Sequence, residues 1–289
     1  MKETIYSWSR VNYTCLAAWY QNYVLEKKGE DNIWNVGGLF EHNLMEHAAK
    51  GAMTQEDCLE AVKNTWYDAV DGLDNPFGYY GKEGNYIEAA EHYYNKTLPF
   101  FTKENTNWLL GKTVSVEEHL EFTLPSGKKF QGFVDRVSVD SDGKSNLAIR
   151  DYKISKRFTR KNVKEKARQL YIYAYGYHQK HGVYPEQLVF EFFQFWDKPK
   201  VIKFKKTDMD EAIEFAESRI REIEGRLKVE RMGMKGMFNP DYKELLDDNG
   251  ERNMFCKSVC GYRNGCPFID GNHLKMFKTK ELQDIEIKK

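Results

Sequence analysis

Residues 113–154 read TVSVEEHLEFTLPSGKKFQGFVDRVSVDSDGKSNLAIRDYKI, and this stretch decides the fold. Polar and apolar residues alternate along it, and β-branched residues are frequent, as in half-buried strands. Pro-Ser-Gly at 125–127 and Ser-Asp-Gly at 141–143 interrupt the alternation with residues typical of turns. The stretch therefore predicts a hairpin followed by a third strand.

The sequence after this stretch predicts two helices and two strands. Residues 163–182 have the pattern of a helix closed by Gly182. A strand-like run follows at 187–197, and 200–206 is a candidate partner for it. Residues 207–229 read as a long helix that opens with a cap-like Thr-Asp. Strands and helices that alternate in this way favour an α/β sandwich around one sheet.

Residues 1–110 are predicted to be mostly helical. Apolar residues recur at helical spacing in 43–51, where Gly51 is a plausible stop, and in 54–70, where Thr54 is a plausible N-cap. Residues 83–101 continue in the same style. Because no linker is visible, we expect one domain over 1–289. It would comprise a helical region (1–110), a catalytic α/β core (111–230) and a cysteine-containing segment (231–289).

The composition is that of a globular protein. Among 289 residues, 15% are aromatic, and 44 Lys and Arg balance 44 Asp and Glu, so any basic surface must be local. No stretch resembles a signal peptide or a membrane span, so we expect a cytoplasmic protein without membrane association. Its five cysteines are then ligands, core residues or catalysts rather than disulfide partners.

Asp135, Asp151 and Lys153 form a candidate catalytic group. In a strand, Asp151 and Lys153 project from one face and Tyr152 from the other. A surface ion pair would explain this pair alone, but Asp135 lies on the preceding strand, which we expect to be a neighbour. Two carboxylates can hold Mg²⁺, which activates a water for hydrolysis, while a lysine orients that water or stabilises developing charge.

Downstream, Gln169 and Tyr173 share one face of the predicted helix 163–182. Taken alone, residues at this spacing serve at the surface or in packing. Together with G-x-V-D-R at 132–136 and D-Y-K at 151–153, however, the run Q-L-x-x-Y-A-Y-G gives three motifs in a specific order and spacing.

These three motifs resemble the RecB-type branch of the PD-(D/E)xK nuclease superfamily, which includes the four-cysteine exonucleases of CRISPR adaptation and related phage and bacterial enzymes. The resemblance implies a restriction-endonuclease-like core with a mixed sheet flanked by helices, and a Mg²⁺- or Mn²⁺-dependent deoxyribonuclease. It assigns metal binding to Asp135, Asp151 and the carbonyl of Tyr152. It also assigns Lys153 to the nucleophilic water, and Gln169 and Tyr173 to positioning.

The family also carries a metal-binding histidine within G-x-x-x-H-x-x-x-E. Gly38, His42 and Glu46 match this pattern, which makes His42 the expected ligand. His47 is the rival candidate, although it falls outside the spacing. An ordinary solvated helix is the alternative.

In relatives with an iron–sulfur cluster, one cysteine precedes the core and three follow it. Cys15, Cys256, Cys260 and Cys266 match this order, so the resemblance implies a [4Fe–4S] cluster that joins the N-terminal helix to the C-terminal loop. The first late gap is three residues here and two in the family, which leaves structural zinc or unliganded thiols as alternatives. Cys58, in an apolar helical pattern, is expected in the core.

A local basic run connects the catalytic strand to the Gln-Tyr helix. Its candidate DNA contacts are Lys156, Arg157, Arg160, Lys161 and Lys164. A solvated helix start is the alternative interpretation.

We expect an exonuclease that acts on DNA ends or single strands in recombination, repair, phage or CRISPR-related DNA processing. Because the sequence has no G-x-x-x-x-G-K-[ST] loop, a separate helicase or recombination protein would have to unwind the DNA. A nicking or structure-specific endonuclease and a non-catalytic DNA-end-binding subunit are the alternatives.

Overall fold

The computed structural model describes residues 4–71, 73, 86–141, 143, 145–240, 245–246, 253, 255–263, 266 and 268. The chain forms two compact units, each assembled from three separate segments. The first, here called the sheet unit, comprises Met1–Asn12, Trp34–Asp71 and Ala90–Lys228. The second, the cysteine unit, comprises Tyr13–Ile33, Gly72–Ala89 and Val229–Lys289. The interpretation of the chain as one domain in three regions stays a prediction.

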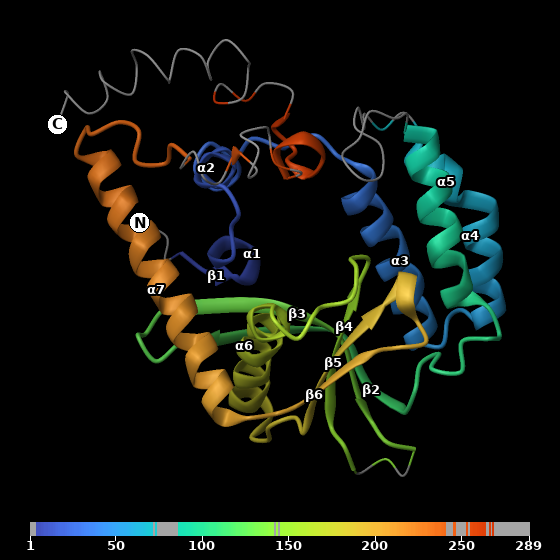
Figure 1. The fold of residues 1–289 in the computed structure, drawn as a ribbon. Helices are drawn as coiled ribbons and strands as arrows, with labels where there is room; N and C mark the ends of the chain where they lie inside the picture. Colours follow the sequence, from blue (N-terminus) through green and yellow to red (C-terminus); the bar gives the residue numbers. More distant parts are fainter. Residues whose placement is uncertain are drawn as a thin grey trace. The chain divides into compact units, whose positions relative to one another are not determined.

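The sheet unit is built on one mixed sheet (Figure 1). Its strands are β1 (Tyr6–Ser7), β2 (Lys112–Thr123), β3 (Lys129–Val139), β4 (Ala148–Lys153), β5 (Gln187–Phe192) and β6 (Lys200–Lys203). Their order is β1-β3-β4-β5-β6, and β2 pairs with β3. β4 and β5 run parallel, so a crossover must join them, and α6 (Val163–His181) supplies it.

The middle of β3 has an unusual setting in the sheet. β1 pairs with residues 130–131 of β3, and β4 pairs with residues 136–138. Between these two stretches, the described ladder pairs β3 with β2. The β3–β4 ladder thus ends next to Asp135, whose carboxylate Oδ2 accepts the Tyr152 backbone N–H at 2.7 Å. A side chain therefore replaces the backbone pairing at this point.

Helices cover both faces of the sheet. α6 and α7 (Lys206–Arg231) bury apolar residues against one face, together with Leu120, Phe130 and Ile149. On the other face, α3 (Ile33–Ala49) and α4 (Gln55–Val70) pack around Tyr152 and Phe193. Tyr152 thus points away from α6, as the strand alternation predicts. Both cores consist of residues far apart in the sequence.

Local signals at the helix ends explain why these segments are helical. Thr54 and Asp57 form a capping box at the start of α4, in which each side chain accepts the other residue's backbone N–H. Gly182 ends α6 in the left-handed conformation (φ 77°), with its N–H donating to the His178 carbonyl at 2.8 Å. Both ends were predicted from the sequence and are confirmed.

The remaining helical segments are short. They are α1 (Trp8–Val11), α2 (Leu16–Tyr23), α5 (Tyr86–Thr97), 3₁₀ turns at Leu98–Phe101 and Phe193–Phe195, and a π turn at Phe255–Val259. In the described residues, no helix combines the length and the apolar character that a membrane crossing requires.

The predicted fold class is confirmed: a mixed sheet is flanked by helices, and a cysteine-containing region lies towards the C-terminus. One detail differs from the sequence analysis. The strand expected over 187–197 ends at Phe192, where the chain turns into a 3₁₀ helix. Asp135 lies on a strand, as expected, in the middle of β3 and at the end of its pairing with β4.

Candidate active site

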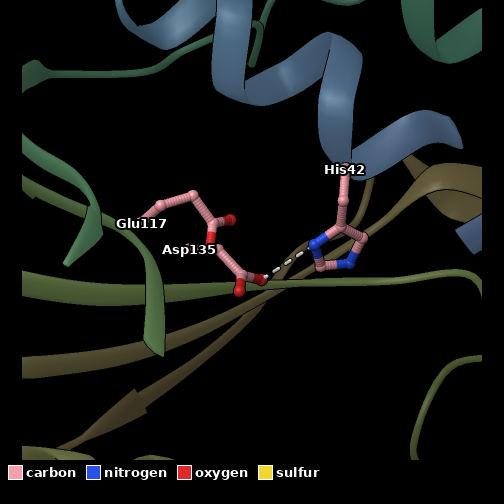
Figure 2. Close-up of side chains that lie close together, drawn as sticks. All are labelled: His42, Glu117 and Asp135. Carbon is pink, nitrogen blue, oxygen red and sulfur yellow. Dashed lines mark ion pairs between the residues drawn. The ribbon is translucent and has the colours of Figure 1, made fainter. Parts of the chain in front are cut away.

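Three side chains from three elements meet beside the middle of β3. His42 comes from α3, Glu117 from β2 and Asp135 from β3, and one ligand atom of each lies within 4.8 Å of the other two (Figure 2). Each of the three is partly buried. The set comprises two hard carboxylate oxygens and one imidazole nitrogen, which are ligands that suit Mg²⁺ or Mn²⁺.

The orientation of His42 leaves one ring nitrogen facing the carboxylates. Nε2 lies 3.0 Å from the Tyr152 carbonyl, which can only accept a hydrogen bond, so Nε2 carries the proton. Nδ1 then has its lone pair and lies 3.6 Å from Asp135 Oδ2. Burial lowers the pKa of His42, which favours the neutral form that binds metal. The backbone thus fixes the tautomer, as in many histidine metal sites.

The two carboxyl groups are held close together at an electrostatic cost. Burial, followed by the charge of Asp151, raises the pKa of Asp135. Burial and the charge of Asp135 raise the pKa of Glu117 to about 7. Glu117 also has a φ of 48°, in the left-handed region that an ordinary residue rarely adopts. Backbone strain of this kind is common at functional sites.

Asp151 and Lys153 form a second group on the α6 side of the sheet. Lys153 Nζ lies 2.6 Å from Asp151 Oδ2, close enough for an ion pair but not aligned as a hydrogen bond. Nζ also donates to Gln169 Oε1 at 3.3 Å, and Gln169 Nε2 donates to the Tyr173 hydroxyl at 3.2 Å. A polar chain therefore runs from Asp151 through Lys153 to α6.

An open cavity of about 480 Å³ is lined by the first group and, from the second group, by Lys153. Its walls include His42, Glu46, Glu117, Asp135 and Lys153. The size is that of a small-molecule site, and the polar atoms converge on it from α3, β2, β3 and β4. A phosphate group that entered this cavity would meet the metal-ligand set and the Lys153 ammonium together.

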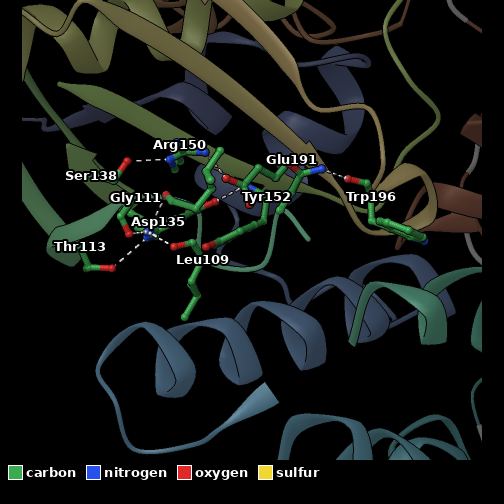
Figure 3. Close-up of polar contacts among 12 residues, drawn as sticks. Leu109, Gly111, Thr113, Asp135, Ser138, Arg150, Tyr152, Glu191 and Trp196 are labelled. Atoms are coloured by element: carbon green, nitrogen blue, oxygen red, sulfur yellow. Dashed lines mark hydrogen bonds and ion pairs between the residues drawn. The ribbon is translucent and has the colours of Figure 1, made fainter. Parts of the chain in front are cut away.

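Buried arginines hold the strands behind the site (Figure 3). Arg136, directly after Asp135, donates to Thr113 Oγ1 and to the carbonyls of residues 109–111. Arg150 donates to Ser138 Oγ at 2.7 Å and forms a buried ion pair with Glu191. These contacts connect β2, β3, β4 and β5, so they position the strands that carry the candidate site without facing the cavity.

Most of the site residues predicted from the sequence are brought together. Asp135 lies with His42; Asp151 lies with Lys153, Gln169 and Tyr173. Asp151 is outside the close group of His42, Glu117 and Asp135, and the Tyr152 carbonyl accepts from His42. His47 is exposed, and its Nδ1 lies 2.7 Å from the Asn43 carbonyl. Glu117 was missed, since nothing in "VEEHLEF" distinguishes it from Glu118 or Glu121.

The basic residues of the run between β4 and α6 are exposed. Lys156, Arg157, Arg160 and Lys161 are exposed in the segment between β4 and α6. Lys164, also exposed, lies 2.7 Å from Glu211 Oε2 and 3.4 Å from Asp208 Oδ1, so α7 already neutralises its charge. Lys164 is therefore a weaker candidate for a phosphate contact than its exposure alone would indicate.

The four predicted cluster cysteines all belong to the cysteine unit. Cys15 and Cys256 are buried in one apolar cluster, and Cys266 packs against it. Cys260 is buried, and its pKa is raised by burial first and also by the nearby Cys266 thiolate. Cys58 is fully buried in the sheet unit, where its Sγ contacts the Leu44 carbonyl at 3.7 Å. The prediction that Cys58 is a core residue is confirmed.

Comparison with known proteins identifies a distant structural likeness. No family model matches the chain, and a search of curated proteins finds no significant match. Among solved structures, the chain is similar to a crystal structure from Eubacterium rectale described as "Putative exonuclease". The TM-score is 0.40 and the identity 15%, over 83% of this chain and 87% of that one.

Proposed function

We propose that this protein is a Mg²⁺- or Mn²⁺-dependent deoxyribonuclease. The observation that carries the proposal is the convergence of His42, Glu117 and Asp135 on a cavity that Lys153 also lines. A metal site alone would fit many reactions. A hard-ligand set beside a lysine ammonium fits the hydrolysis of a phosphodiester, in which negative charge develops on phosphoryl oxygens.

The donor set fits a divalent cation on physical grounds. Asp135 raises the pKa of the Glu117 carboxyl, and Asp151 raises that of Asp135, next to an imidazole whose pKa is lowered by burial; a cation would relieve this repulsion between carboxylates. Such an ion, when bound, polarises a phosphoryl oxygen and lowers the pKa of a coordinated water. His42, Glu117 and Asp135 would hold it, and the charge of Asp151, which acts on the pKa of both His42 and Asp135, supports Asp151 as a further ligand from outside this close group.

The remaining residues have positioning and electrostatic roles. Lys153 presents its ammonium to the cavity and is held by Asp151 on one side and Gln169 on the other. It would orient the attacking water or stabilise the charge that develops on the phosphate. Gln169 and Tyr173 keep Lys153 in place through their own hydrogen bond. Lys156, Arg157, Arg160 and Lys161 would contact the phosphates of the strand beyond the cavity.

We further propose that the cysteine unit holds a [4Fe–4S] cluster through Cys15, Cys256, Cys260 and Cys266. The irregular spacing between Cys256 and Cys260 has a structural counterpart that supports this. The segment forms a π turn, in which the Cys260 N–H donates to the Phe255 carbonyl five residues back at 2.8 Å. A π turn accommodates one additional residue, so the longer gap need not displace either thiol. Structural zinc is the alternative.

A cleavage assay tests the nuclease proposal. Labelled linear duplex, its single strand and a closed circular duplex would be incubated with Mn²⁺, with Mg²⁺ or with EDTA. We expect both linear substrates to shorten from their ends in either metal, and the circle to persist. A nicked circle would support the endonuclease alternative. Retarded but intact DNA in all conditions would support a non-catalytic end-binding protein.

Site variants link the activity to the proposed residues. Asp135→Ala, Asp151→Ala and Lys153→Ala should each abolish cleavage while the protein remains folded. The matched controls are Asp197→Ala and Lys198→Ala, which alter an exposed ion pair of 3.2 Å away from the cavity lining. The site assignment fails if any of the three site variants digests DNA at close to the wild-type rate.

A further inference from the structure

An aromatic pair lies exposed on the sheet next to the proposed active site. Phe133 on β3 is 53% exposed, although it is a large apolar residue in a strand with a buried face. Its ring stacks on that of His119, its cross-strand partner on β2, with centroids 4.7 Å apart and planes inclined by 24°. His119 is itself exposed, so both rings are accessible to a ligand.

The pair lies on the same face of the sheet as the metal-ligand set. Phe130 and Val134 point into the core beneath α6, which places Phe133 on the opposite face. Asp135, two residues on, meets His42 of α3 on that opposite face. Glu117 precedes His119 by two residues on β2. The rings are thus the next cross-strand row after the carboxylates, about 7 Å along the strand.

The stacked pair is also held in place before any ligand binds. His119 Nε2 lies 3.3 Å from Gln131 Oε1, which orients the imidazole ring. Phe133 is fixed by the strand pairing on the β2 side. A ring pair that only stabilised the sheet would contribute more free energy if it were buried. This pair instead exposes apolar surface, one cross-strand row from the cavity proposed to bind the scissile phosphate.

We propose that Phe133 and His119 form a platform on which a base of single-stranded DNA stacks beside the scissile phosphate. The proposal rests on the nuclease function above. A strand whose phosphate lies at the carboxylates carries its bases to either side, and an exposed ring in the next row offers one of them a stacking partner. Every base has a π face, so the platform tolerates any sequence. A base stacked inside a duplex cannot reach it, so the platform favours single strands and frayed ends.

The test compares variants that keep or remove the ring. Phe133→Leu keeps an apolar side chain but removes the ring, and Phe133→Trp restores a ring. Tyr67→Leu is the control, because Tyr67 is a 47% exposed aromatic on α4 whose ring contacts that of Tyr94 in a tilted arrangement, away from the cavity lining. The Kd for a labelled single strand is measured in EDTA, and KM and kcat in Mn²⁺. A series of oligonucleotides carries one abasic site stepped along the strand.

We expect Phe133→Leu to raise Kd and KM about five- to hundredfold, the effect of losing one base–aromatic stack, with a smaller change in kcat. Phe133→Trp should restore both constants, and Tyr67→Leu should leave them unchanged. One position of the abasic site should abolish the difference between wild type and Phe133→Leu, because the same contact is already lost. Circular dichroism melts would confirm that each variant is folded.

Two outcomes would overturn the platform: unchanged Kd and KM in Phe133→Leu, or a loss that is equal for every abasic oligonucleotide. The nuclease proposal fails separately. If the wild type cleaves no DNA in Mn²⁺, yet the ring-dependent difference in Kd persists and one abasic position abolishes it, the stacking site stands and the hydrolytic function does not.

Discussion

Glu117 combines a left-handed backbone with a partly buried carboxylate next to another carboxylate. Neither feature stabilises the metal-free protein, because the conformation is strained and the like charges repel. Both become favourable when a cation lies between Glu117, Asp135 and His42. At the scale of the single residue, the proposed metal site would therefore account for two unfavourable features of Glu117.

The variant Glu117→Gln tests this interpretation without an activity measurement. It removes one negative charge, so the metal-free protein should be as stable as the wild type or more stable. Mn²⁺ should then raise its melting temperature less than that of the wild type, because each tenfold loss of affinity removes about 1.4 kcal/mol of ligand-dependent stabilisation. Glu121→Gln, on the same strand and exposed, is the control. If Mn²⁺ raises the melting temperature of Glu117→Gln as much as that of the wild type, Glu117 is not a metal ligand.

A second residue-scale prediction separates the two histidines of α3. His42→Ala should raise the Mn²⁺ concentration for half-maximal cleavage about tenfold or more, because it deletes an imidazole ligand. His47→Ala should leave that concentration unchanged, since His47 is exposed and lies outside the cavity lining. Metal titrations of the cleavage rate provide the measurement. The opposite ranking of the two variants would mean that the wrong face of α3 carries the ligand.

At the scale of elements, the approach of β3 to α6 sets the position of the lysine. Gly132 has no side chain, and a Cβ there would lie 2.3 Å from a ring carbon of Tyr173. The ring therefore fills the space that any other residue at 132 would need. This close packing keeps the Tyr173 hydroxyl beside Gln169, and Gln169 beside Lys153. Gly132 on β3 thus helps to fix the position of the Lys153 side chain on β4.

Gly132→Ala should displace Tyr173 and break its bond to Gln169. We expect a loss of about 1–3 kcal/mol in unfolding free energy, as for other overpacked cores, and a lower kcat. Gly225→Ala on α7 is the control, because a Cβ there meets no atom within 4 Å, and alanine in a helix should be neutral or stabilising. Urea unfolding and steady-state kinetics provide the two measurements. A Gly132→Ala variant with wild-type stability and kcat would show that the ring can move at no cost.

Some elements of the fold could be predicted from the sequence, and others could not. The hairpin of β2 and β3, the ends of α4 and α6, and the β5–β6 pair follow from alternation, turn residues and caps, which are local signals. Asp135, Asp151, Lys153, Gln169 and Tyr173 follow from motif spacing. Glu117 was not predictable, because its closeness to His42 depends on the β2–β3 register and on a positive φ that glutamate seldom adopts. The two-residue strand β1, parallel to β3, is equally invisible, since it lacks any period of its own.

At the scale of the whole molecule, neither unit is continuous in sequence. The cysteine unit joins residues near the N-terminus to residues beyond 228 by several hydrogen bonds. The Glu30 N–H donates to the Gly261 carbonyl at 2.6 Å, Asn32 Nδ2 to the Val259 carbonyl at 3.0 Å, and the Tyr262 hydroxyl to the Lys27 carbonyl at 2.7 Å. Gly261 permits this approach, because a Cβ there would lie 2.9 Å from the Glu30 carbonyl oxygen. Segments so far apart in the chain need a strong mutual contact to stay ordered.

A shared metal cluster would provide that contact, and the colour of the protein tests it. Protein purified without oxygen should be brown, with broad absorbance near 400 nm, because iron–sulfur clusters give charge-transfer bands that d¹⁰ zinc cannot. Serine at Cys15, Cys256, Cys260 or Cys266 should bleach the colour and lower the melting temperature, since the free energy of metal binding is in part folding free energy. Cys58→Ser is the control and should stay brown, because Cys58 lies in the core of the sheet unit. If the protein is colourless and contains one equivalent of zinc, the four cysteines hold zinc rather than an iron–sulfur cluster, and the cross-link between the segments remains. If the protein contains neither metal and its four thiols can be titrated, both the iron–sulfur and the zinc site are excluded.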